Sequence, residues 1–261
     1  MSSWDLMMRS FRVLGRDKQL VLFPVLSAIA ALMISAPFAI ALFRREGPLV
    51  WNANTAAILF LWYLCANFAI VFFNCALAAC AQVFFNGGVP SLGQGIGQAA
   101  GRAPAILAWA AVASTVGVFL RWLDDRAGLI GRIVIGLIGI GWSMATYLIV
   151  PVLVLEDRGV LESIRRSGEL LRKTWGEQLI AGITFFWAGL LAAIPGIVIG
   201  VIGMNGFWPL IPVAALYFAA LAATVSAARQ VFNVALYRYA TTGEPPEGYS
   251  VDALRGAMRP R

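Results

Sequence analysis

The sequence contains no histidine, and charged residues of either sign are scarce among its 261 residues. Without histidine, the chain lacks the side chain that most often serves as a general base or a metal ligand near neutral pH. Only 13% of the residues are charged and 60% are apolar, whereas soluble domains contain about 25% charged and about 45–50% apolar residues. This composition excludes an ordinary soluble enzyme and a disordered chain.

Two long segments, residues 47–101 and 178–228, contain no charged residue at all. Each is long enough for two helices of the roughly 20 apolar residues that cross a bilayer. Lipid cannot satisfy an open backbone, and the segments lack the alternation of barrel strands, so the chain is predicted to be an all-α integral membrane protein. Uncharged runs predict six transmembrane helices, near residues 20–43, 54–85, 104–120, 132–155, 178–203 and 207–236.

Lysine and arginine are distributed unevenly between the segments that connect these spans. If the N-terminus lies inside, the cytoplasmic segments contain 15 of the 20 basic residues. Basic residues accumulate on the cytoplasmic side of membrane proteins, so both termini are expected in the cytoplasm. The same basic rims account for the net charge of +7. Since no basic run alternates with aromatic residues, no nucleic-acid binding is expected.

Amphipathic segments precede the first and the third pair of spans. In residues 3–16 and again in 160–175, apolar and charged side chains alternate with helical spacing. Both segments predict helices that lie in the plane of the headgroups. Glu162 precedes Arg166 by four residues, the spacing of an ion pair on a helix surface. The residues expected to anchor the protein at the membrane interface are Trp4, Arg9, Arg12, Arg165, Arg166, Trp175 and Arg229.

The segment before the second pair of spans, residues 87–101, contains six glycines. Each glycine weakens a helix by roughly 1 kcal/mol relative to alanine, so this segment is either an interfacial helix or a re-entrant loop. The whole pattern predicts three repeats of an in-plane amphipathic helix followed by a transmembrane hairpin. The repeat units are about 1–86, 87–157 and 158–239, within one membrane domain of residues 1–239 that is followed by a cytoplasmic tail, 240–261.

A polar face is predicted on the second span. Asn67 and Asn74 are seven residues apart, which places them on one side of a helix, with Gln82 roughly in line. Amides at membrane depth form hydrogen bonds between helices more often than they bind a substrate. Both interpretations of this face remain open.

Glycines are spaced on the fourth and fifth spans so that other helices can approach closely. Gly136 and Gly139 lie on the fourth span, and Gly196 and Gly200 lie on the fifth. Small residues at such spacings mark helix contacts. The pattern favours contacts within the bundle over contacts with a partner chain.

Groups of residues that carry catalysis are missing. Ser143 lies in a Gly-Trp-Ser-Met sequence, but the chain has no histidine to activate it. Cys, Asp and Glu do not converge in the pattern of a zinc site, and no carboxylate lies within a predicted span. The sequence therefore predicts no enzymatic activity, no cofactor and no metal.

Four stretches of sequence match a known pattern: Ser10–Lys18 leading into Leu22–Pro24, Val150–Asp157, Ser163–Glu177, and Ala235–Gly243 followed by Pro245 and Pro246. They resemble a family of multi-pass bacterial membrane proteins that is known only as a domain of unknown function. The resemblance implies a helical protein of the bacterial inner membrane. It implies no activity, substrate or catalytic residue.

Two functional hypotheses follow. The favoured one is a non-enzymatic accessory or scaffold subunit that acts through lateral contacts with membrane lipids, another membrane protein or a second copy of itself. The alternative is a permease-like transporter of a small neutral or amphipathic solute, which would use the face of Asn67 and Asn74 and a cavity between the second, fifth and sixth spans. An intramembrane enzyme is less favoured because the usual bases are missing.

Overall fold

A computed structural model describes residues 3–44 and 53–243, although the side chains at 3–7, 9, 42–43, 53 and 173–186 lie outside the description. The described residues form helices and short connections. Six helical segments are long and apolar enough to cross a membrane, at 18–41, 54–85, 103–124, 129–155, 187–204 and 210–242. The predicted all-α fold with six candidate spans is therefore confirmed. In chain order the elements are α1 Ser3–Arg16, η1 Lys18–Val21, α2 Leu22–Phe43, α3 Ala53–Phe85, α4 Leu92–Gly101, α5 Ala103–Asp124, α6 Leu129–Ala145, α7 Ile149–Leu155, α8 Val160–Met204 and α9 Leu210–Thr242.

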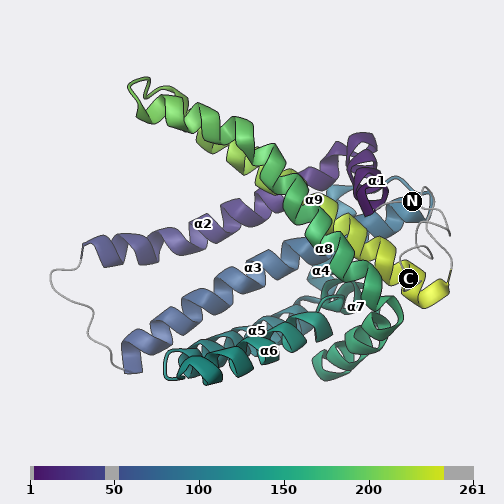
Figure 1. Ribbon diagram of the computed structural model, residues 1–261. Helices are drawn as coiled ribbons and strands as arrows, with labels where there is room; N and C mark the ends of the chain where they lie inside the picture. The colour runs from purple at the N-terminus through teal and green to yellow at the C-terminus, as the bar shows by residue number, and fades with distance from the viewer. Residues whose placement is uncertain (1–2, 45–52, 244–261) are drawn as a thin grey trace.

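The six long segments form three hairpins, α2–α3, α5–α6 and α8–α9, that diverge from a shared end of the molecule (Figure 1). We call this shared end the base; it comprises α1, η1, α4, α7 and the adjoining ends of the long helices. Within it α1 packs against α8 and α9, while α4 and α7 both pack against α3. We call the opposite ends of the hairpins the far ends; there the α8–α9 hairpin points away from the other two, while α3 and the α5–α6 hairpin run close together (Figure 1). Whether the three hairpins are copies of one repeat unit stays a prediction.

The buried core lies at the base. It is built mainly from small or branched residues of α3, α7 and α9, in the stretches 75–81, 148–154 and 231–236, with Leu20, Phe23, Ile106 and Leu170 added from other elements. Alanines such as Ala76 and Ala228 are completely buried. Small side chains let helix backbones approach closely, which is the main source of helix association in lipid. The base is therefore where the hairpins are held together.

The glycine-rich segment 87–101 contains a helix, α4. Ser91 caps its start, because the Ser91 hydroxyl accepts a hydrogen bond from the backbone N–H of Gln94 at 3.2 Å. A Cβ added at Gly95 would lie 2.6 Å from both the carbonyl oxygen of Ala76 and the sulfur of Cys80 on α3. Glycine at this position therefore allows α4 to lie directly on α3. The segment thus contains a helix over Leu92–Gly101, and its place at the membrane interface stays a prediction.

The fourth span is interrupted between α6 and α7. The backbone N–H of Leu148 in this interruption donates to the hydroxyl of Ser167 on α8, at 3.1 Å. An unsatisfied backbone N–H is costly away from water, and the serine removes that cost. The short helix α7 is thereby fixed against α8.

The predicted in-plane helix 160–175 and the fifth span belong to one unbroken helix, α8. At 1.5 Å per residue its 45 residues extend over about 67 Å, roughly twice the 30 Å hydrocarbon thickness of a bilayer. Its first turns carry charges outward and bury Ser163, Ser167 and Leu170 in the base. The sequence predicts a boundary here from charge, but charge marks a change of surroundings and does not end a helix.

Candidate functional site

The polar contacts of the base are concentrated where helix α7 ends. Arg102, between α4 and α5, donates through Nε to the carbonyl oxygen of Leu153 at 3.2 Å, and its two terminal nitrogens bond the Glu156 carbonyl oxygen and the Asp157 carboxylate. Gln98 of α4 donates to the Val154 carbonyl oxygen at 3.3 Å. The last carbonyls of a helix lack partners within the helix and carry partial negative charge. Arg102, a cation, and the amide of Gln98 supply those partners.

The Glu156 carboxylate joins three further elements. It accepts hydrogen bonds from the Tyr237 hydroxyl of α9 at 3.0 Å and from Arg166 Nε of α8 at 3.2 Å, and it pairs with Arg158 in the loop before α8. Only 14% of the Glu156 side chain is exposed. We call Arg102, Glu156, Arg158, Arg166 and Tyr237 the base cluster; it links α5, α7, α8 and α9 at one point.

The ionisation of Glu156 is set by competing effects. Burial raises the pKa of its carboxyl group, but the hydrogen bonds from Arg158, Tyr237 and Arg166 outweigh burial and hold the pKa below its ordinary value. The carboxylate is therefore charged at neutral pH. Beside it, a shallow hollow of about 430 Å³ is lined by residues that include Gln98, Arg102 and Asp157.

A matching cap is found at the end of α3. Arg238 of α9 donates to the carbonyl oxygen of Phe85 at 2.6 Å and to the side-chain oxygen of Asn86 at 2.8 Å. The chain reverses beyond this point through Gly87, whose positive φ of 77° suits glycine. Arginines from other elements thus close the base ends of both α3 and α7: Arg238 follows α3 in the chain, and Arg102 precedes α7.

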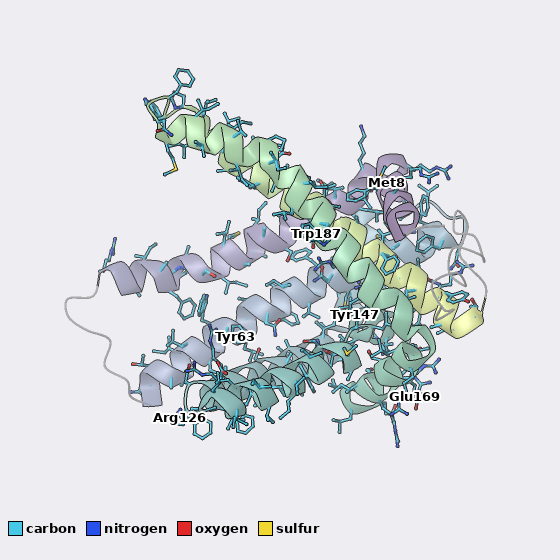
Figure 2. The ribbon with its side chains drawn as sticks, viewed as in Figure 1. Met8, Tyr63, Arg126, Tyr147, Glu169 and Trp187 are labelled. Atoms are coloured by element: carbon cyan, nitrogen blue, oxygen red, sulfur yellow. The ribbon has the colours of Figure 1, made fainter. Side chains whose placement is uncertain are left out.

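A second site lies outside the base, along the α5–α6 hairpin. It is a groove of about 470 Å³ with a largely apolar lining: Leu120, Gly136, Gly139, Ile140, Trp142, Ser143, Met144 and Tyr147. The Trp142 ring stacks on Trp109 of α5, with ring centroids 5.8 Å apart. Figure 2 shows Tyr147 and Arg126 at opposite ends of this hairpin. Gly136 and Gly139 line this groove without side chains of their own, and Trp142 and Tyr147 line it toward the base.

The predicted polar face of α3 does not form a single site. The Asn67 amide donates to the hydroxyl of Ser114 at 3.2 Å and to the carbonyl oxygen of Ala110 at 3.4 Å, both on α5. Asn74 has no hydrogen bond with a described residue in the structure, and the buried side-chain oxygen of Gln82 has no partner among the described residues. Neither hollow reported above is lined by any of the three amides.

The predicted glycine faces differ between the two hairpins. A Cβ at Gly196 would lie 2.5 Å from the ring of Tyr217, and one at Gly200 would lie 3.7 Å from Ala214, so α8 and α9 pack through these glycines. A Cβ at Gly136 or Gly139 would have no neighbour within 4 Å. These two glycines line the open groove instead of a contact within the bundle.

The predicted interfacial anchors are only partly visible. Arg12, Arg165 and Arg229 have exposed side chains, whereas the side chains of Trp4, Arg9 and Trp175 lie outside the described ones. Arg166 pairs with Glu156 and with Glu169, not with the predicted Glu162. The spacing of Glu162 suits an ion pair on the helix surface, but the largely buried carboxylate of Glu156, in the loop before α8, is the partner that Arg166 has.

Sequence reasoning missed most of the base cluster. Its members come from positions as distant as 102 and 237, so no local spacing reveals them. The sequence does contain one indication of the cluster. Arg102 is the single charged residue between residues 47 and 120, so it could have been singled out as a residue in need of a polar partner. Among the described residues, no group of His, Cys, Asp or Glu is arranged to hold a metal ion.

The fold and the base cluster define a class: a helical protein with six segments able to cross a membrane, tied together at one end. Residues 53–247 match the family of unknown function DUF6159, and the chain belongs to this family. The match runs from the start of α3 past the end of α9 and includes the whole base cluster. No curated protein and no solved structure is significantly similar to the chain.

Proposed function

We propose that this protein is a non-enzymatic, multi-pass protein of the bacterial inner membrane that acts through lateral contacts, as an accessory or scaffold subunit for lipid or another membrane protein. The base, with Arg102, Arg158, Arg166 and Arg238, faces the cytoplasm in this proposal, as the excess of basic residues favours. Both termini then lie on that side.

The observation that carries the proposal is the large apolar surface of the hairpins. On α6 and α8, residues such as Leu137, Ile138 and Leu191 have more than half of their surface exposed. The α5–α6 hairpin adds the open groove beside Gly136 and Gly139. In a bilayer such faces contact lipid chains or another helix, and small residues at a surface favour the close approach of either.

The transporter alternative lacks a comparable observation. Its predicted polar face contains Asn67, but that amide is bonded to α5. The groove that the structure does contain opens along the α5–α6 hairpin, away from the space between α3, α8 and α9 that a transport pathway was expected to use. Lateral contact is therefore the function that the geometry supports best.

The test uses a photo-reactive amino acid placed at Ile140, in the groove, in the full-length protein within bacterial membranes. A matched control places it at Val89, which is 86% exposed but lies in the loop before α4. We expect Ile140 to yield a defined adduct, either one partner chain or one lipid class enriched over its share of the membrane, and Val89 to yield neither. A monomeric protein whose Ile140 adducts simply mirror bulk lipid would contradict the proposal.

A further inference from the structure

Two buried amides of helix α9 have no hydrogen-bond partner in the part of the chain that the structure describes. Gln230 is 7% exposed and Asn233 is 9% exposed, yet the side-chain nitrogen of Gln230 and the side-chain oxygen of Asn233 are both unbonded there. Buried polar atoms of Gln82 and Ser163 also lack a described partner, but they lie on other helices. A polar atom that is buried without a hydrogen bond destabilises a protein by about 1–3 kcal/mol. Two such atoms three residues apart therefore call for a common partner.

The surroundings of these amides are protein on every side. Each residue of α9 from Gln230 to Tyr237 is buried, because α1, α3, α7 and α8 all pack against this helix. Phe232 and Val234, from the same stretch, belong to the hydrophobic core of the base. The contrast is with Asn67 of α3, whose amide bonds directly to α5. The amides of α9 are enclosed as well, but without such a neighbour.

The two amides share one face of α9 with Tyr237. Asn233 follows Gln230 by three residues and precedes Tyr237 by four, and residues at these spacings are neighbours on a helix surface. The Tyr237 hydroxyl donates to the Glu156 carboxylate at 3.0 Å, which leaves the hydroxyl oxygen able to accept a hydrogen bond. These three side chains therefore form a polar row that extends from the base cluster about 10 Å along α9, within its candidate span.

The free hydrogen-bonding capacity of this row matches that of one water molecule. Gln230 offers a donor, whereas Asn233 and Tyr237 offer acceptors. A buried water molecule typically forms about three hydrogen bonds to polar groups that are otherwise unsatisfied. The spacing also fits, because side chains three or four residues apart on a helix have Cβ atoms about 5–6 Å apart. Two hydrogen bonds that share one water molecule span about the same distance.

We propose that the base binds one internal water molecule among Gln230, Asn233 and Tyr237. The Gln230 amide donates to this water, which donates in turn to the Asn233 side-chain oxygen and to the Tyr237 hydroxyl oxygen. Because the hydroxyl oxygen is then occupied as an acceptor, its proton is directed at Glu156. Gln230 and Asn233 are thus positioning residues, and they extend the base cluster into the candidate span. The water site is independent of the lateral contacts proposed above.

The test is solid-state nuclear magnetic resonance of the full-length protein in lipid bilayers, with isotope-labelled side-chain amides. Magnetisation that starts on water is followed to each amide at short mixing times. Gln94, which is exposed on α4 at the base, is the positive control. Asn67, whose amide bonds to α5, is the negative control. We expect the Gln230 amide to receive magnetisation from water, as Gln94 does, and Asn67 to receive none.

Two variants of Asn233 separate a bound water molecule from simple packing. Asn233→Leu removes an acceptor and fills the space with an apolar side chain, so the transfer to Gln230 should be lost. Asn233→Ser keeps a hydroxyl group and leaves room for water, so the transfer should persist.

Three results would overturn the proposal. They are a wild-type transfer to Gln230 no larger than that to Asn67, a direct contact between the Gln230 and Asn233 amides without water, and a transfer that survives Asn233→Leu. The wild-type comparison decides even if Asn233→Leu does not fold. A defined adduct at Ile140 would support lateral contact as the function whichever result is obtained.

Discussion

At the base, Leu153 of α7 and Phe232 of α9 are enclosed by protein, whereas toward the far ends Leu137 of α6 and Leu216 of α9 are 63% and 72% exposed. All four are large apolar residues in candidate spans. The difference lies in what surrounds them: the base adds short helices and polar caps that hold the long helices together, and the far ends have only the helices. In lipid, apolar character alone does not bring helices together. The base therefore assembles the protein and the far ends present its surface.

Shortening a large apolar side chain should have very different effects on stability at the base and on the hairpin faces, and this is the largest difference that we expect. Leu153→Ala leaves a cavity in the base and should lower the free energy of unfolding by about 2–4 kcal/mol. Leu137→Ala removes an exposed side chain and should change it by less than about 0.5 kcal/mol. Unfolding by sodium dodecyl sulfate in mixed micelles measures both. Equal losses in the two variants would remove the distinction.

Because α4 lies on α3, alanine substitutions at two nearby glycines of α4 should change the stability in opposite directions. Gly95→Ala places a methyl group against Ala76 and Cys80 and should destabilise the protein by about 1–3 kcal/mol. Gly97→Ala meets nothing within 4 Å and should stabilise α4 by up to about 1 kcal/mol, because alanine favours helix. The same unfolding assay compares them. Stabilisation in both variants would show that α4 does not lie on α3.

The base cluster adds a pH-dependent contribution. Glu156→Gln should cost about 1–2 kcal/mol of stability at pH 7, because three donors lose a charged acceptor. The pKa of Glu156 is lowered in the folded protein, so its contribution is complete above the unfolded pKa and is lost as the pH falls through the folded pKa. The deficit of the variant should therefore shrink below about pH 4.

Glu169→Gln is the matched control for this effect. Among the described side chains Glu169 pairs with Arg166, at 3.8 Å, and its side chain is 56% exposed. An exposed pair of this kind contributes about 0.3–0.5 kcal/mol. A pH-independent deficit in Glu156→Gln, or an equally large one in Glu169→Gln, would refute the role assigned to the base cluster.

The smallest expected effect concerns the amides of α3. Asn67→Leu removes two hydrogen bonds to α5 and should cost about 0.6 kcal/mol, the average for such bonds in membranes. Asn74→Leu should be neutral, since the Asn74 side chain forms no hydrogen bond with a described residue. Thermal unfolding of both variants in detergent provides the comparison. A larger loss in Asn74→Leu than in Asn67→Leu would point to a contact that the structure lacks.

The spans were predictable from the sequence because each is a local property: an uncharged run of sufficient length gives α2, α3 or α9 without knowledge of any neighbour. The continuity of α8 was not predictable from the sequence. Its first turns are charged and the rest is apolar, which suggests two separate elements, yet both parts belong to one helix. The interruption at Leu148 was not predictable either, since it depends on a serine 19 residues later.

The candidate sites divide in the same way. The spacing of Gly136, Gly139, Gly196 and Gly200 reveals small faces, but only the fold determines that the first two are open and the last two meet α9. The base cluster joins residues 102, 156, 166 and 237, whose proximity is a consequence of the topology. Local patterns thus locate surfaces and spans, and the pairing of distant polar groups requires the structure.

The most direct test of this two-ended molecule is the quenching of single native tryptophans by phospholipids with brominated chains. Trp187 of α8 is 56% exposed, and Trp109 of α5 is 5% exposed. Each is kept in turn while the other tryptophans are changed to phenylalanine, with one protein molecule per nanodisc. Strong quenching of Trp187 and weak quenching of Trp109 is the predicted result. Equal quenching of the two would contradict the separation into an enclosed base and open hairpin faces.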